Sequence, residues 1–394
     1  MKYEILDRNN LEKFNLISII NKDNLTKGLK KNKIIKIIFW FLIIIFFLVL
    51  VFIFFFLYYN NLERNLLVKF NNNLLTIKND ILALLSKKDI YKTNHIKENS
   101  INNEIEYLKY HQLYFCENQN LFNNSLIEEQ LKSVKVNFNN ITFDMIVYKY
   151  NDVVSNFISN LGTWELKETE SILSSLFYYS RKKNITKNDI FMLDIGANIG
   201  WYSLFLGKNG FNIISFEPSK KNYYILLKNY CLNHDINMTI VNKGLDLDEK
   251  KCNLYHPLGN LGNAHLFCDI PKLNKTNYFS EEIKLSKLSN YIEYLKDKNL
   301  ALIKLDIEGS EGRAILGGID LIFKYHIPFI FMEFTPRLLR KKGTEPKDLL
   351  EMFEKNGYKI SEHNFLSQEY SSIEELIYKP QTNIYISYEN FIKK

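Results

Sequence analysis

The feature that most constrains this chain is an uncharged stretch near its N-terminus, Ile37–Tyr59, which reads IIFWFLIIIFFLVLVFIFFFLYY. As an α-helix these residues reach about 34 Å, and the hydrocarbon core of a bilayer is about 30 Å thick. A cleaved signal peptide has a shorter apolar run of about 7–15 residues and a small-residue cleavage site, and neither is present. The stretch therefore predicts a transmembrane helix that acts as a signal anchor.

The two flanks of this stretch differ in basic residues. Arg64, Lys69 and Lys78 follow it, whereas six lysines precede it, at positions 22, 27, 30, 31, 33 and 36. Because basic residues stay on the cytosolic side, residues 1–36 are predicted to be a cytosolic tail. The chain is then a single-pass type II membrane protein, and the part after Tyr59 lies in the lumen of the secretory pathway.

Residues 60–136 are predicted to form a helical stalk and a spacer. Apolar residues in the first part alternate spacings of three and four, at Leu67, Phe70, Leu74, Ile77, Ile81 and Leu84. This apolar seam, the a and d positions of a heptad repeat, covers fewer than three heptads, which is short for a coiled coil. Two interpretations of residues 67–84 stay open: a helix that pairs in a homodimer, and an amphipathic helix that lies on its own domain.

Glycine and proline are concentrated in the C-terminal half. The first proline is Pro218, and thirteen of the fifteen glycines lie at or beyond Gly196, so residues 137–394 are predicted to be the compact, turn-rich domain. A net charge of +7 without basic and aromatic residues interleaved in a block argues against a nucleic-acid partner. All four cysteines follow the apolar stretch; in a lumen they can pair in any of three ways, and free thiols are the alternative.

A strand, a glycine-rich turn and a helix are predicted in succession from Phe191. The strand Phe191–Ile195 leads into the turn Gly196–Gly200, and a helix begins near Trp201. Glycines at such a turn let the backbone approach a ligand closely, and the following helix offers free N–H groups. A second strand, Ile213–Phe216, ends on Glu217, where a carboxylate can accept hydrogen bonds from a ribose diol. The pattern predicts a nucleoside-containing cofactor.

The spacing of the turn residues indicates which cofactor. A dinucleotide site requires G-x-G-x-x-G, whereas Gly196 and Gly200 are four apart with Asn198 between them. Asp194 just before the turn favours a cationic ligand. The sulfonium and amino groups of S-adenosylmethionine (SAM) meet that preference.

The C-terminal part, roughly residues 140–394, resembles the FkbM-type SAM-dependent methyltransferases. The residues that carry the resemblance are NDVVSNFISNLGTWE (151–165), LDIGANIGWYS (193–203), SFEPS (215–219), LIKLDIEGSEGRAILGG (302–318) and PFIFMEF (328–334). The resemblance implies a class I methyltransferase fold, a Rossmann-like α/β fold with a seven-stranded, mostly parallel sheet. It also implies methyl transfer to a hydroxyl, typically on a sugar or natural product.

The resemblance also assigns cofactor residues. Asp194, Gly196, Ala197, Asn198 and Gly200 are expected around the methionine part of SAM, and Glu217 at its ribose. The chain departs from the family at Leu285–Leu288, where Ser286 stands in place of an aspartate often found there. No role is expected of that position.

Catalytic residues are predicted in the last part of the strand Leu300–Ile307 and directly after it. Lys304, Asp306 and Glu308 share one face by the period of two, at the edge where open α/β sheets bind ligands. Asp306 is the first choice for the base that takes the hydroxyl proton, and His265 is a second candidate. Alternatively, Asp306 and Glu308, with Glu333, hold a divalent metal ion, or Lys304 and Glu308 form a structural ion pair or cap the next helix.

The function expected from the sequence is a SAM-dependent O-methyltransferase acting on a hydroxyl of a glycan or glycoconjugate. Its expected partners are this small-molecule or glycan acceptor and the membrane lipid around residues 37–59. Two alternatives stay open: a membrane-tethered, inactive methyltransferase fold with an interaction role, and a nucleotide-cofactor oxidoreductase or epimerase. Absence of SAM binding would rule out the first expectation, and binding of a nicotinamide cofactor instead would favour the oxidoreductase.

Overall fold

The computed structural model describes residues 101–122, 125–150, 152–257, 265–268 and 278–393. They belong to one compact unit, residues 96–394. The cytosolic tail, the transmembrane helix at 37–59 and the seam at 67–84 predicted above lie outside the described residues. Among the residues that the structure does describe, no helix is both long and apolar enough to cross a membrane.

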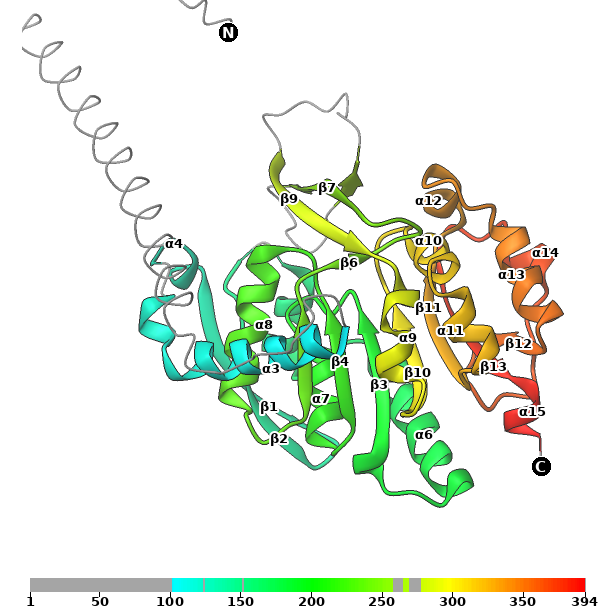
Figure 1. The fold of residues 1–394 in the computed structure, drawn as a ribbon, viewed down its shortest axis with the longest axis horizontal. Coiled ribbons are helices and arrows are strands. Elements are labelled where there is room, and N and C mark those ends of the chain that lie inside the picture. The colour runs from blue at the N-terminus through cyan, green and yellow to red at the C-terminus, as the bar shows by residue number, and fades with distance from the viewer. Residues whose placement is uncertain (1–100, 123–124, 151, 258–264, 269–277, 394) are drawn as a thin grey trace, which may run out of the picture. The chain divides into compact units, whose positions relative to one another are not determined.

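A seven-stranded sheet forms the centre of the unit (Figure 1). Its strand order is β12-β13-β11-β10-β3-β4-β5; β13 runs antiparallel to both of its neighbours, and the other pairings are parallel. In chain order the strands are β3 (Ile190–Ile195), β4 (Asn212–Phe216), β5 (Met238–Val241), β10 (Asn299–Leu305), β11 (Phe329–Phe334), β12 (Tyr358–Ser361) and β13 (Thr382–Tyr388). The mostly parallel α/β sheet expected from the sequence is confirmed.

The central strands are apolar on both faces because helices cover both. Leu193, Ile303 and Ile330 belong to one buried cluster, while the neighbouring residues along the same strands belong to another. Helices of the first side are α10 (Glu311–Leu316), α11 (Ile319–Lys324) and α13 (Pro346–Lys355); those of the second are α6 (Leu166–Lys183), α7 (Trp201–Lys208) and α8 (Lys220–Leu232). The result is a three-layer sandwich with two cores.

Shorter elements complete the described part of the chain. They are α4 (Ser125–Glu128), α5 (Val153–Leu161), α9 (Ile292–Leu295), α12 (Pro336–Lys341), α14 (Ile373–Leu376), α15 (Glu389–Ile392) and the 3-10 turns Gln119–Leu121, Lys187–Asp189 and Leu288–Tyr291. A hairpin of β1 (Leu131–Phe138) and β2 (Ile141–Tyr148) packs on α8 and α7.

Helix α3 (Ile101–Glu117) covers the edge strand of the main sheet. The side-chain amide of Gln112 donates to the carbonyl of Met238 (3.0 Å), and its oxygen accepts from the N–H of Ile240 (2.8 Å). These bonds provide partners for backbone groups at the edge of β5 that no neighbouring strand pairs. Helix α3, which the sequence analysis assigned to the stalk and spacer, thus packs onto the sheet in the structure.

All four cysteines form disulfides, Cys116–Cys231 and Cys252–Cys268. This is one of the three pairings that the sequence left open. The first bond joins α3 to α8 and closes a loop with a sequence separation of 115 residues. Long loops lose the most entropy when they are closed in the unfolded chain.

Replacing Cys116 and Cys231 together by serine is expected to lower the free energy of unfolding by about 2–4 kcal/mol. The measurement is urea unfolding of the full chain under oxidising conditions. The matched control is the same experiment with reductant for both proteins, in which wild type and variant should unfold alike, because reduction also opens Cys252–Cys268 in both. Equal midpoints for wild type and variant without reductant would contradict the bond.

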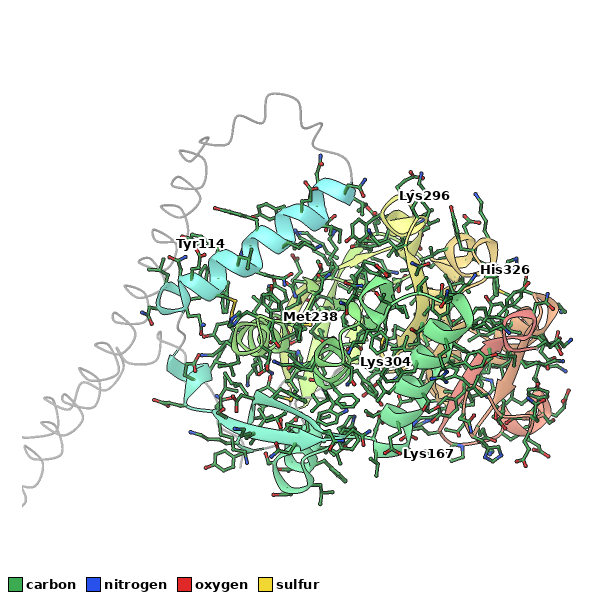
Figure 2. All side chains as sticks on the ribbon, turned by 90° about the horizontal axis from the view of Figure 1, so that it is seen from below. Tyr114, Lys167, Met238, Lys296, Lys304 and His326 are labelled. Atoms are coloured by element: carbon green, nitrogen blue, oxygen red, sulfur yellow. A yellow bond between two sulfur atoms is a disulfide. The ribbon has the colours of Figure 1, made fainter. Side chains whose placement is uncertain are left out.

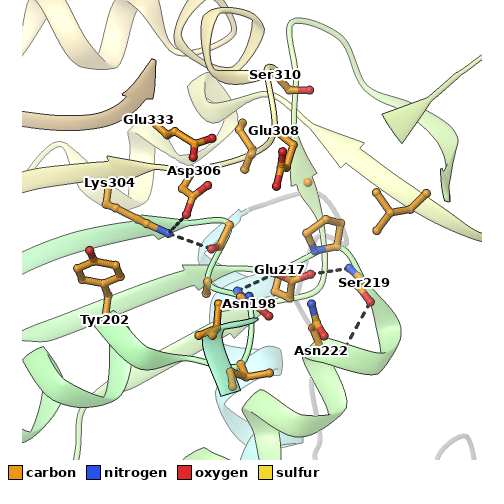
Figure 3. Close-up of a pocket in the computed structure, with 18 of the residues that line it drawn as sticks. Asn198, Tyr202, Glu217, Ser219, Asn222, Lys304, Asp306, Glu308, Ser310 and Glu333 are labelled. Carbon is orange, nitrogen blue, oxygen red and sulfur yellow. Dashed lines mark hydrogen bonds and ion pairs between the residues drawn. The ribbon is translucent and has the colours of Figure 1, made fainter. Parts of the chain in front are cut away.

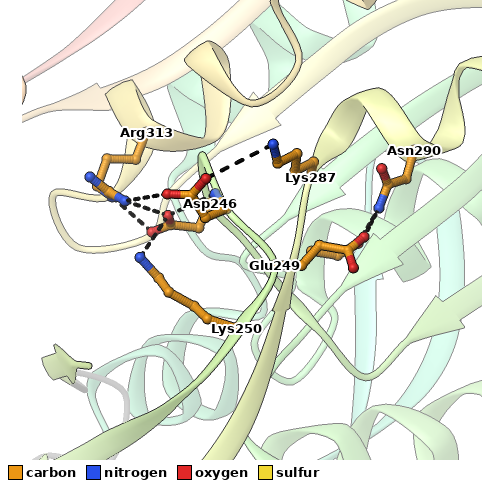
Figure 4. A network of polar contacts seen from close by, with 8 residues as sticks. Asp246, Glu249, Lys250, Lys287, Asn290 and Arg313 are labelled. Atoms are coloured by element: carbon orange, nitrogen blue, oxygen red, sulfur yellow. Dashed lines mark hydrogen bonds and ion pairs between the residues drawn. The ribbon is translucent and has the colours of Figure 1, made fainter. Parts of the chain in front are cut away.

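A smaller sheet is inserted between β5 and β10. Its order is β6-β9-β7-β8, and its strands are β6 (Gly244–Leu245), β7 (Lys250–Pro257), β8 (His265–Phe267) and β9 (Tyr278–Ser286). Buried Asp246, just after β6, accepts two hydrogen bonds from Arg313 of α10, at 2.6 and 2.9 Å, and pairs with Lys250 at 3.1 Å (Figure 4). This bidentate pair ties the inserted sheet to the main domain.

Candidate cofactor and active site

The turn between β3 and α7 requires glycine. Gly196, Asn198 and Gly200 all have left-handed backbone conformations, with φ of +83°, +51° and +99°. The N–H groups of Gly196 and Ala197 both donate to the carbonyl of Phe216 at the end of β4 (3.0 Å each). A Cβ on Gly196 would lie 1.9 Å from the carbonyl oxygen of Asp306. The turn is therefore pressed against both neighbouring strands.

This turn forms one side of a cavity of about 310 Å³. Gly196, Ala197 and Asn198 line the cavity, together with Glu217 from the end of β4. Asp194 and Gly200 are not among the lining residues; they lie beneath the turn and shape it. Of the six residues that the sequence assigned to the cofactor, five thus belong to this turn or lie directly beneath it. The sixth, Glu217, faces them from the end of β4.

Glu217 is buried and holds the turn from the second strand. Its two carboxylate oxygens accept from the N–H groups of Asn198 (2.8 Å) and Ser219 (2.9 Å). Burial raises the pKa of Glu217 to about 8, although these two N–H donors oppose the increase. Each oxygen keeps a second lone pair, so the carboxylate can still accept hydrogen bonds from a diol.

Lys304 of β10 lies at the centre of the polar site and is 2% exposed (Figures 2 and 3). Its ammonium donates to the carbonyl of Gly196 (3.0 Å) and lies 3.4 Å from Asp194 and 3.5 Å from Asp306. Burial lowers the pKa of Lys304, but the carboxylates of Asp194, Asp306 and Glu165 outweigh it and raise the pKa above its ordinary value. Lys304 is therefore a buried cation that joins the glycine turn after β3 to Asp306, just after β10.

The other oxygen of Asp194 is bonded from below. Ser203 of α7 donates to it at 2.5 Å, and the hydroxyls of Ser203 and Ser215 lie 2.7 Å apart. Asp194 is fully buried, and the oxygen that faces Lys304 has no hydrogen bond. This carboxylate thus depends on the ammonium of Lys304 for its charge compensation.

Four carboxylates line the cavity on the side away from Glu217: Glu165, Asp306, Glu308 and Glu333. Burial, reinforced by the charge of Asp306, raises the pKa of Glu165 and of Glu308 to about 7. Burial and the neighbouring carboxylates raise the pKa of Glu333 to about 9, and Gln381 donates to it at 2.5 Å. Groups that titrate near neutral pH inside a cavity are candidates for proton transfer.

The segment predicted to be catalytic, residues 304–308, leaves the strand earlier than the sequence predicts. The strand ends at Leu305, and Glu308 and Gly309 have φ of +55° and +94°. The period-two argument for a shared face therefore stops at Leu305, and Glu308 reaches the cavity through a left-handed turn. Lys304 pairs with Asp194 and Asp306, so the ion pair with Glu308 considered from the sequence is not the arrangement formed.

Buried Glu311 holds this turn in place. One of its oxygens accepts from the N–H groups of Ile307 (2.8 Å) and Gly309 (3.2 Å), and the other has no hydrogen bond. Burial raises the pKa of Glu311 from 4.5 to about 7 in spite of these donors. The folded state therefore binds this proton more tightly than the unfolded state does. Its stabilising effect is complete below pH 4.5 and is lost as the pH rises through 7.

Replacing Glu311 by glutamine is therefore expected to stabilise the protein at alkaline pH. At pH 8.5 the variant should exceed the wild type by up to about 3 kcal/mol in free energy of unfolding, and at pH 4 the two should be nearly equal. Urea unfolding at both pH values measures this, with exposed Glu129→Gln as control. If the wild type is more stable than Glu311→Gln at pH 8.5, the buried carboxylate is stabilised in its charged form and the prediction is wrong.

Glu165 was not predicted as a site residue. It lies at the start of α6 with φ of +43° and accepts from the hydroxyl of Tyr202 (2.7 Å). It is the last residue of the motif 151–165 that contributes to the family resemblance. No local sequence pattern indicates that this residue lies at the cavity. Long-range packing brings it there.

The inserted sheet supplies the remaining wall. Leu245, Leu254, Ile283 and Leu285 form an apolar surface, and His256 lies among them with its ring 3.0 Å from buried Glu281. His265 pairs with Tyr255 in the backbone of β8, and its side chain lies outside the described atoms. Among the described residues, no group of three or more His, Cys, Asp or Glu has the arrangement of a metal site.

The sheet order and the glycine turn facing Glu217 define an α/β protein of the Rossmann-like class. Within that class the sequence comparison is specific: residues 194–360 match the family model described as the methyltransferase FkbM domain. The chain carries a methyltransferase FkbM domain over these residues. Comparison with curated proteins found no significant match.

Comparison with solved structures found methyltransferases among its matches. One is the methyltransferase FkbM from Methylobacillus flagellatus KT, with 19% identity over 50% of this chain and 44% of that chain and a TM-score of 0.30. Another is the bifunctional kinase-methyltransferase WbdD, with 12% identity over 56% of this chain and 39% of that chain and a TM-score of 0.33. A third is the SAM-bound magnesium protoporphyrin IX methyltransferase from Synechocystis PCC 6803, with 12% identity over 60% of this chain and 83% of that chain and a TM-score of 0.30. This chain spans less than half of the first two. The residue roles below do not depend on these likenesses.

Proposed function

We propose that this protein is a SAM-dependent O-methyltransferase that acts on a hydroxyl of a glycan or glycoconjugate. The observation that carries the proposal is a convergence of four elements on one cavity. The glycine turn after β3, Glu217 after β4, Asp306 and Glu308 after β10, and Glu333 of β11 all line it (Figure 3). This is the carboxyl edge of the sheet, where α/β folds bind ligands.

The residues present fit SAM. Glu217 has acceptor capacity for the two ribose hydroxyls, and the buried side-chain oxygen of Asn198 has no hydrogen-bond partner in the described structure. The surplus of carboxylates over Lys304 suits a ligand with a positive charge. SAM supplies an electrophilic methyl group on a positively charged sulfur when it is bound.

The chain's own residues position the acceptor and take its proton. Lys304 holds Asp306 in place, so this carboxylate is suited to orient a hydroxyl by accepting its hydrogen bond. Glu308 lines the cavity and its pKa is raised by burial to about 7, so we propose it as the proton acceptor near neutral pH. The sequence ranks Asp306 first as the base, and this proposal places Glu308 before it.

Calorimetric titration of the full chain with SAM tests the proposal. Wild type should bind, and Glu217→Gln should bind at least about tenfold more weakly, since the amide replaces one acceptor oxygen at the ribose by an N–H donor. Exposed Glu282→Gln is the matched control and should bind as the wild type does. No heat from the wild type, or equal binding by Glu217→Gln, would sink the enzyme proposal, and binding of a nicotinamide cofactor instead would favour an oxidoreductase.

Labelled SAM identifies the acceptor. The full chain is incubated with extracts fractionated into glycan, lipid and protein, and the label should appear in a glycan-bearing fraction. Binding of SAM without label in any fraction would favour the inactive, membrane-tethered alternative.

We also propose a lumenal address, with residues 37–59 as the anchor and, through residues 67–84, a homodimer. Two disulfides support an oxidising compartment, because such bonds are rare in the cytosol. Protease added to sealed vesicles should spare the C-terminal domain. Its digestion would place that domain in the cytosol.

A further inference from the structure

Helix α5 carries more apolar residues than its packing buries. Ile158 is buried in the core. Val153, Phe157 and Leu161 follow one another at intervals of four residues, so they share one face of the helix, beside the buried residues. Together with Tyr150 and Leu166 on either side of the helix, they are 45–72% exposed. We call these five residues the α5 stripe.

The α5 stripe begins at the mouth of the cavity. Val153 itself lines the cavity, and Phe157 packs edge-to-face on Trp164 with ring centroids 5.4 Å apart. Trp164 is a lining residue, and so is the next residue, Glu165. The polar lining of the cavity is thus adjacent to an apolar outer surface. The carboxylates lie inside the cavity, and the apolar side chains of α5 lie outside its mouth. Contiguous exposed apolar surface beside a cavity is typical of a binding site.

The size of the cavity requires part of the acceptor to lie outside. Pockets that hold one drug-sized molecule have volumes of about 300–1,000 Å³. A cavity of about 310 Å³ is filled by a cofactor and the reacting end of an acceptor. The rest of the acceptor must rest on the surface that adjoins the mouth, and the α5 stripe is part of that surface.

We propose that the acceptor is an amphiphile whose hydroxyl-bearing head enters the cavity and whose hydrocarbon chain lies along the α5 stripe. This inference rests on the proposed methyltransferase function and names the class of its substrate. An apolar chain gains free energy from burial against such side chains in proportion to the area removed from water. The predicted anchor at 37–59 would keep the chain at a membrane, where acceptors bearing hydrocarbon chains are found.

The test uses the full chain in lipid nanodiscs and a photoreactive alkyl β-glucoside with a diazirine in its alkyl chain. After illumination, labelled peptides are mapped by mass spectrometry. Residues 150–166 should be labelled above other exposed apolar segments, and octyl β-glucoside should compete at least about tenfold better than methyl β-glucoside, which shares the head. Phe157→Ser with Leu161→Ser should reduce the labelling at least about fivefold.

The matched control is Leu121→Ser with Tyr378→Ser, which removes one exposed leucine and one exposed aromatic ring elsewhere; its labelling should equal that of the wild type. Equal competition by the two glucosides, or equal labelling in both double variants, overturns the inference. So does preferential labelling of the stripe by a photoreactive phospholipid of the nanodisc, or its crosslinking to a protein. SAM titration of the Phe157/Leu161 variant should match the wild type; absence of SAM binding in the wild type refutes the proposed function separately.

Discussion

Replacing Lys304 by methionine is expected to lower the free energy of unfolding by about 3–5 kcal/mol, since a buried charge pair loses one partner. Asp194 and Asp306 would lose their shared cation, and the carbonyl of Gly196 would lose a donor. Methionine keeps the length and apolar stem of the side chain, so the effect comes from the charge. Urea unfolding at pH 7.5 measures it.

Two comparisons make this experiment specific. Lys284→Met on exposed β9 removes the same charge from the surface and should change stability by less than about 0.5 kcal/mol. At acidic pH the deficit of Lys304→Met should shrink, because protonated carboxyl groups no longer need the cation. A deficit that is the same at pH 4.5 and pH 7.5 would mean that packing, and not charge, is what Lys304 contributes.

Replacing Gly196 by alanine is expected to reduce SAM affinity by about a hundredfold or more and to destabilise the fold. The left-handed backbone alone costs a residue with a Cβ about 1–2 kcal/mol. The new Cβ would also lie 1.9 Å from the carbonyl oxygen of Asp306, so β3 and β10 cannot both keep their positions. SAM titration and thermal unfolding of the same preparation measure the two effects.

Gly162 supplies the matched control. It has a similar φ of +70°, and a Cβ there meets no atom within 4 Å. Gly162→Ala should therefore show the conformational cost of about 1–2 kcal/mol without loss of SAM binding. Equal effects of the two alanines would refute the close contact between the turn and Asp306.

The fold could be predicted because its signals are local. The strand Phe191–Ile195, the strand Ile213–Phe216 and the helix near Trp201 correspond to β3, β4 and α7 within one residue. Apolar runs, glycines and the residues beside them depend on near neighbours in the chain. The same holds for the cofactor turn, whose left-handed positions are the two glycines and Asn198 that the motif displays.

The candidate site could be predicted only in part because it is assembled from distant segments. Glu165, which the sequence did not indicate, reaches the cavity from the start of α6, and the left-handed turn at Glu308 depends on the buried carboxylate of Glu311. Glu333 was named from the sequence only as a possible metal ligand. The pairing of Lys304 with Asp194 joins two neighbouring strands that lie far apart in the sequence. The spacing of apolar residues within one segment cannot predict contacts between distant segments.

The sequence by itself determined the α/β class, the place of the glycine turn and the identity of the residues beside it, because backbone propensity and apolar periodicity act over a few residues. Only the tertiary structure decided which cysteines pair, which carboxylates share Lys304 and which face of α5 stays exposed. These outcomes depend on which surfaces meet across the fold. An apolar period shows that a face can be buried, and packing alone decides whether another element covers it.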